Sequence, residues 1–196
     1  MRKYERSERD VFSAPIAPFC EGRLAADAAV EEQRTHFDML GLQLGYAYES
    51  GALVPDGTPQ PPPVSPSVFE PSARPGARIP HAWLVPFPGP SFGKEGNAVL
   101  SSLDLIASDA MTLVSFSDHE VWSAAAAAIK QIPLIHHRVG IDVKDADGTW
   151  GALCELRNGG ALIVRPDQHV AARFTSTPDS TKVTLAAALD QILSRI

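Results

Sequence analysis

The side chains with catalytic potential in this sequence are two cysteines and two short clusters of serine, aspartate and histidine. Cys20 and Cys154 are the only cysteines among 196 residues. Two thiols so far apart in the chain provide no disulfide framework, and we interpret Cys154 as a small buried residue in a strand. The sequence contains no Cys-x-x-Cys pair, which thiol redox chemistry needs at a helix N-terminus to lower a thiol pKa.

The polar clusters also give no clear active site. Ser117, Asp118 and His119 have the residue types of a hydrolase triad, but sequence neighbours do not form that geometry, and no nucleophile elbow is present. Ser117 and a glutamate three residues later instead predict a helix capping box. His136 and His137 are adjacent on an expected strand, so they point to opposite faces. We expect one at the edge of the core and one exposed, with no shared metal.

One glycine-rich stretch, Gly89 to Glu95, partly resembles a phosphate-binding loop. Its spacing to the lysine is one residue short, and Glu95 stands where a serine or threonine would bind magnesium. We therefore assign no residue of this chain as catalytic, cofactor-binding or metal-binding.

Charge and hydropathy exclude other classes of partner. The net charge is −6, whereas nucleic-acid-binding domains usually carry a basic patch. No apolar run approaches the ~20 residues needed to cross a bilayer, and the charged N-terminus has no apolar segment of a secretory signal behind it. We expect a cytoplasmic protein with no nucleic-acid and no membrane partner.

The proline distribution divides the chain. Twelve of the 17 prolines lie between Pro55 and Pro90, so this segment should run extended over a surface and should not join a central sheet. A helix is expected before it, over residues 24–40, ended by Gly41 or Gly45. Short strands are expected at residues 46–48 and 52–54. We divide the chain into an N-terminal helical segment with a short strand (1–50), a Pro-rich extended connector (51–98) and a main domain (99–196).

The main domain alternates strands and helices. A continuous apolar run at residues 110–116 predicts a buried parallel strand, followed by a helix that contains five alanines and by a second strand at 134–141. Two apolar runs around Pro166-Asp167-Gln168 predict a hairpin, and residues 181–196 predict a closing helix. This order is α/β with a small mixed sheet and flanking helices, and it matches the thioredoxin-like fold.

Several runs resemble, in order, the C-terminal region of FAD-dependent aromatic hydroxylases, the flavin monooxygenases of phenols, chlorophenols and aromatic polyketides. The runs are "HFDMLGLQLGYAYESGALVPDGT", "FEPSARPGARIPHAWL", "SSLDLI", "MTLV" and "LIVRPDQHVAARF". The resemblance covers about residues 34 to 173, and the expected final helix fits it too. The Arg-Pro-Gly-x-Arg-x-Pro-His-x-Trp-Leu run and the Val-Arg-Pro-Asp-x-His-Val-Ala run are specific together.

The resemblance implies a thioredoxin-like domain without redox cysteines, which packs on flavin and substrate domains and contributes to dimer contacts. The Arg-Pro-Gly run would be the connector that enters this domain. Arg74 and Arg78 would anchor it to carboxylates or carbonyls; the alternative is that both are solvated loop arginines. His81 and Trp83 would pack and form hydrogen bonds rather than catalyse.

Two positions depart from the family pattern. The family usually has glycine where Gln168 stands and tryptophan where Ala172 stands. Because Asp-Gly is the favoured tight turn, Asp167-Gln168 should be strained or use another turn. A contact that relatives make through the tryptophan is in doubt here.

The flavin-binding part of the family is missing from this sequence. Residues 1–60 contain neither the Gly-x-Gly-x-x-Gly fingerprint nor the Gly-Asp motif that FAD binding requires. FAD and NAD(P)H therefore belong to the full-length family, and we expect no cofactor in this chain.

Two functions are compatible with this sequence. The first is a non-catalytic C-terminal domain that covers, stabilises or dimerises an FAD-dependent aromatic-ring monooxygenase. The alternative is an accessory subunit that completes a flavin monooxygenase by docking on a separate FAD-binding polypeptide. The expected partner is accordingly a second copy, as a homodimer, or a flavin-domain polypeptide. A thiol oxidoreductase is disfavoured, and the aromatic substrate is left open.

Overall fold

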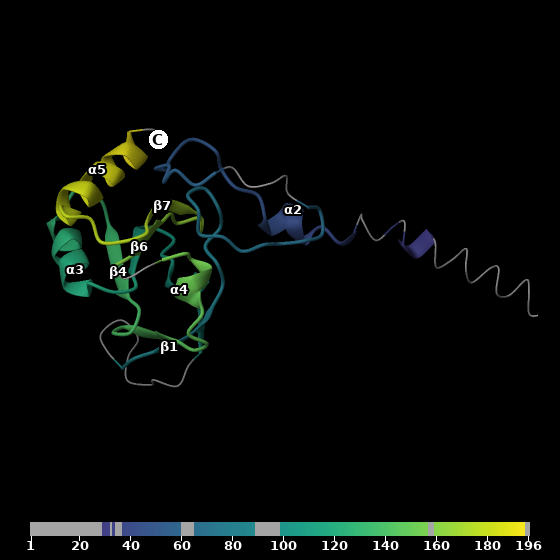
Figure 1. The fold of residues 1–196 in the computed structure, drawn as a ribbon, viewed down its shortest axis with the longest axis horizontal. Coiled ribbons are helices and arrows are strands. Elements are labelled where there is room, and N and C mark those ends of the chain that lie inside the picture. The colour runs from purple at the N-terminus through teal and green to yellow at the C-terminus, as the bar shows by residue number, and fades with distance from the viewer. Residues whose placement is uncertain are drawn as a thin grey trace, which may run out of the picture. The chain divides into compact units, whose positions relative to one another are not determined.

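The computed structural model describes residues 29–31, 33, 37–59, 65–88, 99–156 and 159–194 (Figure 1). The chain divides into two compact units, Met1–Met39 and Leu40–Ile196. In the first unit, residues 29–31, 33 and 37 are helical. The helix expected over 24–40 does not continue to its predicted end, because Asp38 and Met39 are not helical and Leu40 begins the next helix; its remaining residues lie outside the described ones. Cys20 and the glycine-rich stretch at 89–95 also lie outside them.

The main sheet of the second unit has four strands in the order β4-β3-β6-β7. They are β3 (Met111–Ser115), β4 (Leu134–Arg138), β6 (Ala161–Val164) and β7 (Val170–Phe174). β3 and β4 are parallel, whereas β6 runs antiparallel to both β3 and β7. Every residue of β3 and β6 is buried, as expected for central strands covered on both faces. The small mixed sheet and its hairpin are confirmed.

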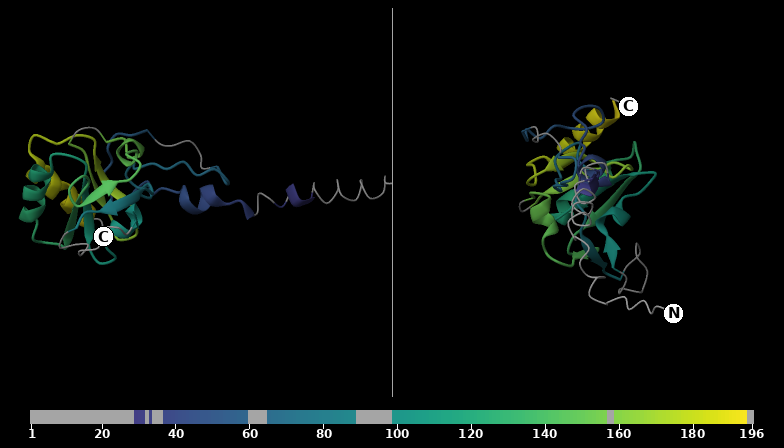
Figure 2. Two further views of the ribbon diagram at one scale, coloured as in Figure 1. Left: turned by 90° about the horizontal axis from the view of Figure 1, so that it is seen from below. Right: turned by 90° about the vertical axis from the view of Figure 1, so that its right-hand side faces the viewer.

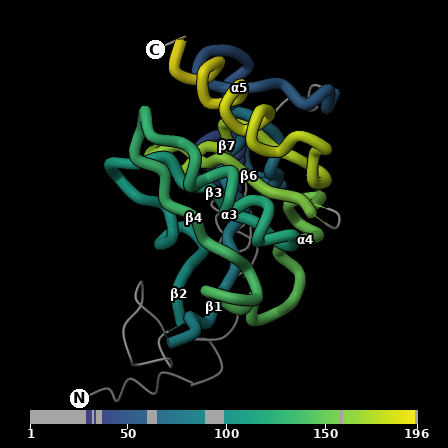
Figure 3. Tube along the Cα trace, turned by 90° about the vertical axis from the view of Figure 1, so that its left-hand side faces the viewer, coloured from purple at the N-terminus to yellow at the C-terminus, as the bar shows by residue number. Residues whose placement is uncertain are grey.

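Two long helices pack on one face of this sheet, namely α3 (His119–Ala128) and α5 (Thr181–Leu193) (Figure 2). Trp122 of α3 and Leu185 of α5 share a buried cluster with Leu113 and Ile163, which alternate along their strands with residues of the opposite face. The path of the chain through α3, β4, β6, β7 and α5 can be followed in Figure 3. This succession of a βαβ unit, a hairpin and a closing helix agrees with the predicted α/β arrangement.

The other face is covered by a second, smaller sheet and the short helix α4 (Trp150–Leu153). The small sheet has the order β2-β1-β5, from β2 (Leu100–Ser101), β1 (Trp83–Pro86) and β5 (Val143–Asp145), all antiparallel. A 3-10 helix, η1, follows β2 over Ser102–Leu105. Leu84, Val143 and Trp150 pack there against Val114 and Leu162 of the main sheet.

The connector, which was expected to run extended and not to join a central sheet, contributes no strand to the main sheet but forms a strand of the small sheet near its C-terminal end. β1 is the middle strand of the small sheet. It lies between the dense proline clusters, and its one proline, Pro86, is the last strand residue. The next residue, Phe87, has an N–H and donates it to Asp142 O (2.8 Å). Proline at a strand end therefore costs no ladder hydrogen bond.

The prediction of short strands at residues 46–48 and 52–54 was also wrong. Ala47 makes only an isolated bridge with Ala77, and Val54 donates a single backbone hydrogen bond to Ala171 O (2.7 Å). Before them, α2 (Leu40–Leu44) is followed by Gly45, one of the two glycines expected to end a helix. The other, Gly41, lies inside α2, where a Cβ would overlap the backbone oxygen of Ser65.

The predicted capping box at Ser117 does not form. Asp118, with φ of 48°, precedes the first residue of α3, and no side chain caps this helix. The Ser117 hydroxyl instead accepts a hydrogen bond from the Gly159 N–H, just beyond the paired ends of β3 and β6. A tertiary partner has displaced the local one, since the buried Gly159 donor needs an acceptor.

Candidate functional site

The Arg-Pro-Gly run of the connector lies beside β7 and extends the main sheet on that side. Gly76 donates its N–H to Val170 O (2.7 Å), and Val170 donates to Ala77 O (2.9 Å). Ile79 then donates to Gln168 O in the hairpin turn (2.9 Å). The two runs that are most specific for the family resemblance therefore bind each other through their backbones.

The connector arginines bind oxygen atoms, in keeping with the predicted anchoring role. Arg78 Nη2 donates to Gln168 Oε1 (2.7 Å). Arg74 Nη1 donates to the carbonyl of Pro59 (3.4 Å), while its buried Nε has no hydrogen-bond partner among the described residues. Gln168 itself has φ of +67°, the left-handed conformation that explains why glycine suits this turn position. The expected strain at Asp167-Gln168 is thus present.

The end of the connector is held by the small sheet and α4. The carbonyl of Pro80 accepts hydrogen bonds from Trp150 Nε1 and from Ser102 Oγ, both at 2.9 Å. His81 Nδ1 lies 2.9 Å from Ser101 Oγ, and the His81 ring packs edge-on to Trp83 at 4.7 Å. These contacts are the packing and hydrogen bonding expected of His81 and Trp83.

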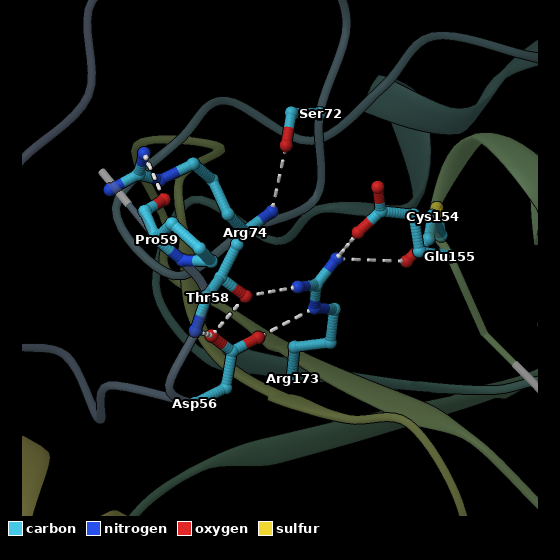
Figure 4. A network of polar contacts seen from close by, with 8 residues as sticks. All are labelled: Asp56, Thr58, Pro59, Ser72, Arg74, Cys154, Glu155 and Arg173. Carbon is cyan, nitrogen blue, oxygen red and sulfur yellow. Dashed lines mark hydrogen bonds and ion pairs between the residues drawn. The ribbon is translucent and has the colours of Figure 1, made fainter. Parts of the chain in front are cut away.

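A buried arginine on β7, Arg173, joins the connector to the body of the domain (Figure 4). Its Nε lies 2.7 Å from Asp56 Oδ2, its Nη2 donates to Thr58 Oγ1 (2.6 Å), and its Nη1 donates to Glu155 Oε2 (2.5 Å). The same Nη1 also lies 3.5 Å from the carbonyl oxygen of Cys154. The side chain of Arg173 is 3% exposed and that of Asp56 is 11% exposed.

The surroundings of Asp56 favour the charged form of its carboxyl, which pairs with Arg173. Burial alone would raise the pKa of the Asp56 carboxyl, but hydrogen bonds from Thr58 and Arg173 bring it below its ordinary value. Sequence reasoning missed this ion pair. The signal available was one arginine within the apolar run of β7, because a buried charge requires a partner of opposite sign.

An aromatic and cationic cluster forms where the connector, the hairpin turn and the segment after α2 meet. The rings of Tyr46 and Tyr48 lie 5.2 and 4.9 Å from the buried imidazole of His169. The guanidinium carbon of Arg165 lies 4.8 Å from the centre of the Tyr48 ring, a cation–π contact. Arg165 also forms a 2.6 Å ion pair with Asp167. Sequence reasoning did not identify this cluster.

At the β3–α3 junction, where a thioredoxin would carry its thiols, the structure has a serine–histidine network. Ser115 Oγ lies 2.8 Å from His119 Nδ1 and 2.9 Å from His136 Nε2. His136 Nδ1 lies 3.3 Å from Ser123 Oγ on α3. Ser115 has no exposed surface, so its hydroxyl is inaccessible to a substrate.

His136 and His137 point to opposite faces of β4, as predicted, but the prediction that one of them is exposed was wrong. His136 contacts α3, and His137 is buried on the opposite face. Neither is fully exposed, because α3 covers the face to which His136 points. Burial lowers the pKa of His136 to about 4, and the positive charge of Arg138 contributes in the same direction.

Cys154 lies at the C-terminal end of α4, not in a strand as interpreted from the sequence. It is fully buried, and this burial raises the pKa of its thiol to about 12. Within the described ranges, no group of three or more histidine, cysteine, aspartate or glutamate side chains is placed to hold a metal ion. None of the described helices is both long and apolar enough to cross a membrane.

Comparison with known proteins finds relatives among flavin monooxygenases. Tetracenomycin A2 monooxygenase-dioxygenase of Streptomyces glaucescens is 36% identical over 156 residues, which are 77% of this chain and 26% of that protein. The 2,4-dichlorophenol 6-monooxygenase of Delftia acidovorans is 32% identical over 181 residues, 89% of this chain and 29% of that protein.

Solved structures give the same result. The flavin-dependent monooxygenase PieE, in complex with FAD and substrate, superimposes with a TM-score of 0.73 and 34% identity over 89% of this chain and 30% of that one. Aklavinone-11 hydroxylase with FAD and aklavinone gives 0.67 and 30% identity, over 80% of this chain and 28% of that one. The chain thus spans under a third of the length of each relative. The family described as "Aromatic-ring hydroxylase, C-terminal" matches residues 72–195, well over half of the sequence, and the chain belongs to that family.

Proposed function

We propose that this chain is the non-catalytic, thioredoxin-like C-terminal domain of an FAD-dependent aromatic-ring monooxygenase, with a structural role. The observation that carries the proposal is that the most specific family motifs bind each other. The Arg-Pro-Gly run pairs with β7, and the Pro80 carbonyl receives hydrogen bonds from Trp150 and Ser102. These residues serve the architecture of the domain, which supports a covering, stabilising or dimerising role.

The absence of a reactive thiol in the described residues supports a role without redox chemistry. Ser117, Asp118 and His119 stand where redox cysteines would be needed, and Cys154 is buried with a raised pKa. A thiolate, not a thiol, is the nucleophile in disulfide exchange. We expect no disulfide-reductase activity in an insulin-reduction assay with dithiothreitol. Turnover above the reagent blank that disappears in Cys154→Ser would contradict this.

FAD and NAD(P)H binding would belong to the remainder of the parent enzyme. Binding FAD requires a glycine-rich turn at a helix N-terminus to hold the pyrophosphate. The structures of PieE and aklavinone-11 hydroxylase contain FAD, and this chain matches less than a third of each. Within this chain, Gly76 serves a close backbone approach to Tyr48 instead.

The test is a fluorescence titration of FAD with the purified chain, together with an NADPH-oxidation assay containing phenol. We expect neither saturable FAD binding nor phenol-stimulated NADPH oxidation, while a full-length relative shows both. Stoichiometric FAD binding by this chain would overturn the proposal.

The alternative is an accessory subunit that docks on a separate FAD-binding polypeptide. Exposed apolar side chains on α2 favour it, since Leu40 is 48% and Leu42 is 45% exposed. Co-purification of a flavin-containing polypeptide with the chain from its native host would support this alternative. For either function we propose a cytoplasmic location, in view of the two widely separated cysteines.

A further inference from the structure

A surface cavity of about 180 Å³ is lined by the segment after α2 and by two parts of the connector. Part of its wall is apolar, from the buried Leu53 and Pro75 and the exposed Pro55. The other lining residues carry polar or charged groups, namely Tyr48, Glu49, Asp56, Thr58 and Arg74. What this cavity can bind depends on which of these charges already have a partner within the domain.

The charged groups of the lining differ in their partners. Asp56 binds Arg173 and Thr58, so its negative charge is compensated. Within the described residues, no ion pair involves Arg74 or Glu49. Glu49 is exposed, and water weakens the effect of an exposed charge. The half-buried Arg74 is therefore the cation of this cavity that lacks a counter-ion.

The guanidinium of Arg74 also has donors to spare. Its Nη1 makes one long hydrogen bond, of 3.4 Å, to the carbonyl of Pro59 (Figure 4). Its buried Nε has no partner within the described part of the chain, although a buried donor without an acceptor is costly. The edge formed by Nε and one Nη is the fork that binds both oxygens of a carboxylate. A bond as long as 3.4 Å is weak, so it does not prevent the small rotation that turns this edge to the cavity.

The base of this side chain is fixed, by contrast. The N–H of Arg74 donates to Ser72 Oγ (3.2 Å), and the carbonyl of Arg74 accepts from the Ala77 N–H (3.0 Å). Tyr48, on the other side of the cavity, donates its N–H to the carbonyl of Gly76 (2.9 Å). The backbone around the cavity is thus ordered before any ligand arrives, which lowers the entropic cost of binding.

We propose that this cavity binds a small carboxylate with an apolar body. Its two oxygens bind the guanidinium of Arg74, and its apolar part packs on Leu53, Pro55 and Pro75. A phosphate dianion suits the cavity less well, because it gains nothing from the apolar wall and meets twice the repulsion from Glu49. The site goes beyond the structural role proposed above and does not depend on it.

The experiment is a titration of the ¹⁵N-labelled chain followed by amide chemical shifts. Benzoate is the probe, and benzamide is its neutral control of the same shape. Aspartate with blocked backbone groups is the third ligand, because it presents a carboxylate as a protein side chain would. Thermal unfolding of each protein variant shows whether it still folds.

We expect saturable benzoate binding, with shifts centred on the cavity, and binding of benzamide at least tenfold weaker. Arg74→Met should weaken benzoate binding by about tenfold or more, since it removes a charge-assisted pair of hydrogen bonds. Arg74→Lys should lie between, because it keeps the charge and loses the fork. Glu49→Gln should tighten binding by about threefold by removing the repulsion. Lys182→Met removes the same charge from an exposed site on α5 and should change nothing.

Two results would overturn the proposal directly. One is the lack of saturable shifts with benzoate, and the other is unchanged affinity in a folded Arg74→Met variant. If Arg74→Met does not fold, unchanged affinity in both Arg74→Lys and Glu49→Gln has the same meaning. Tighter binding of the blocked aspartate than of benzoate would show that the cavity receives a protein side chain, so the assignment to a small molecule would be wrong.

Discussion

At the scale of single residues, buried charge is the most informative feature of this domain. Arg173 lies within a strand whose first four residues are buried, yet four oxygen atoms from two segments surround its guanidinium. Its bonds to Asp56 and Thr58 tie the connector to β7, more than 100 residues away in sequence (separations of 117 and 115). A buried pair of this kind is costly to break, because removing one partner leaves the other charge buried without compensation.

We therefore predict that Arg173→Met lowers the free energy of unfolding by about 3 kcal/mol. The methionine fills much of the same space but leaves the carboxylate of Asp56 without its cationic partner. Urea denaturation followed by circular dichroism measures the change.

Glu155→Gln is the matched control, since that side chain is 67% exposed and contacts the same guanidinium. Exposed ion pairs contribute about 0–1 kcal/mol, so this variant should be close to the unaltered chain. Equal losses in both variants would show that burial of Asp56 is not the cause.

At the scale of elements, the connector behaves as an additional edge of the main sheet. Its central glycine, Gly76, has φ of +93°, and its N–H and C=O bind β7 and Tyr48 respectively. A Cβ at this position would stand 1.9 Å from the backbone oxygen of Tyr48. The close approach of two backbone segments, in addition to the positive φ, is what requires glycine here.

Gly76→Ala should destabilise the domain by more than about 2 kcal/mol, because backbone strain and a steric clash add. Gly51→Ala provides the comparison, since Gly51 has φ of +100° and nothing within 4 Å of an added Cβ. Its cost should be only the strain of about 1 kcal/mol. Thermal unfolding of the two variants side by side would refute the close-contact explanation if their losses were the same.

Three histidines on α3 and β4 should make stability depend on pH. The pKa values of His136, His119 and His137 are all lowered, chiefly by burial, although Asp142 opposes the shift in each and Asp118 also does so for His119. A histidine that titrates lower in the folded state binds protons first in the unfolded state. Stability should therefore be complete above about pH 6.5, the ordinary histidine value, and should fall as pH drops toward 4.

Urea midpoints between about pH 7.5 and 4.5 would measure this dependence. The pKa values of Asp56 and Asp142 are lowered from their ordinary value of 3.8, so the stability that these carboxylates contribute is lost only as the pH falls below this window. His136→Gln, whose amide can still reach Ser115, should flatten the profile. A midpoint that stays constant over the range would mean that these histidines are protonated equally in both states.

At the scale of the whole molecule, the chain exposes large apolar side chains and matches only part of the length of its relatives. Leu40 and Leu42 on α2 are 48% and 45% exposed, and the relatives are more than three times as long as the matched segment. Large exposed apolar side chains that gather on one element usually mark an interface.

The isolated chain should accordingly self-associate, with a dimer as the main species. Sedimentation velocity at rising protein concentration would show the shift, and Leu42→Ser should move it toward monomer because α2 then loses apolar contact area. A chain that remains strictly monomeric at high concentration would count against a dimerising role.

The sequence by itself determined the α/β order, the buried strand β3, the hairpin β6–β7 and the family. These features depend on local periodicity, turn residues and motifs that each lie within a short window. The role of proline at Pro86, the bond of Ser117 to Gly159 and the pairing of Arg173 with Asp56 were decided by the tertiary structure. Each depends on a partner that is distant in sequence, because buried donors, acceptors and charges must be satisfied wherever the chain brings a matching group. Local pattern cannot specify which distant group that will be.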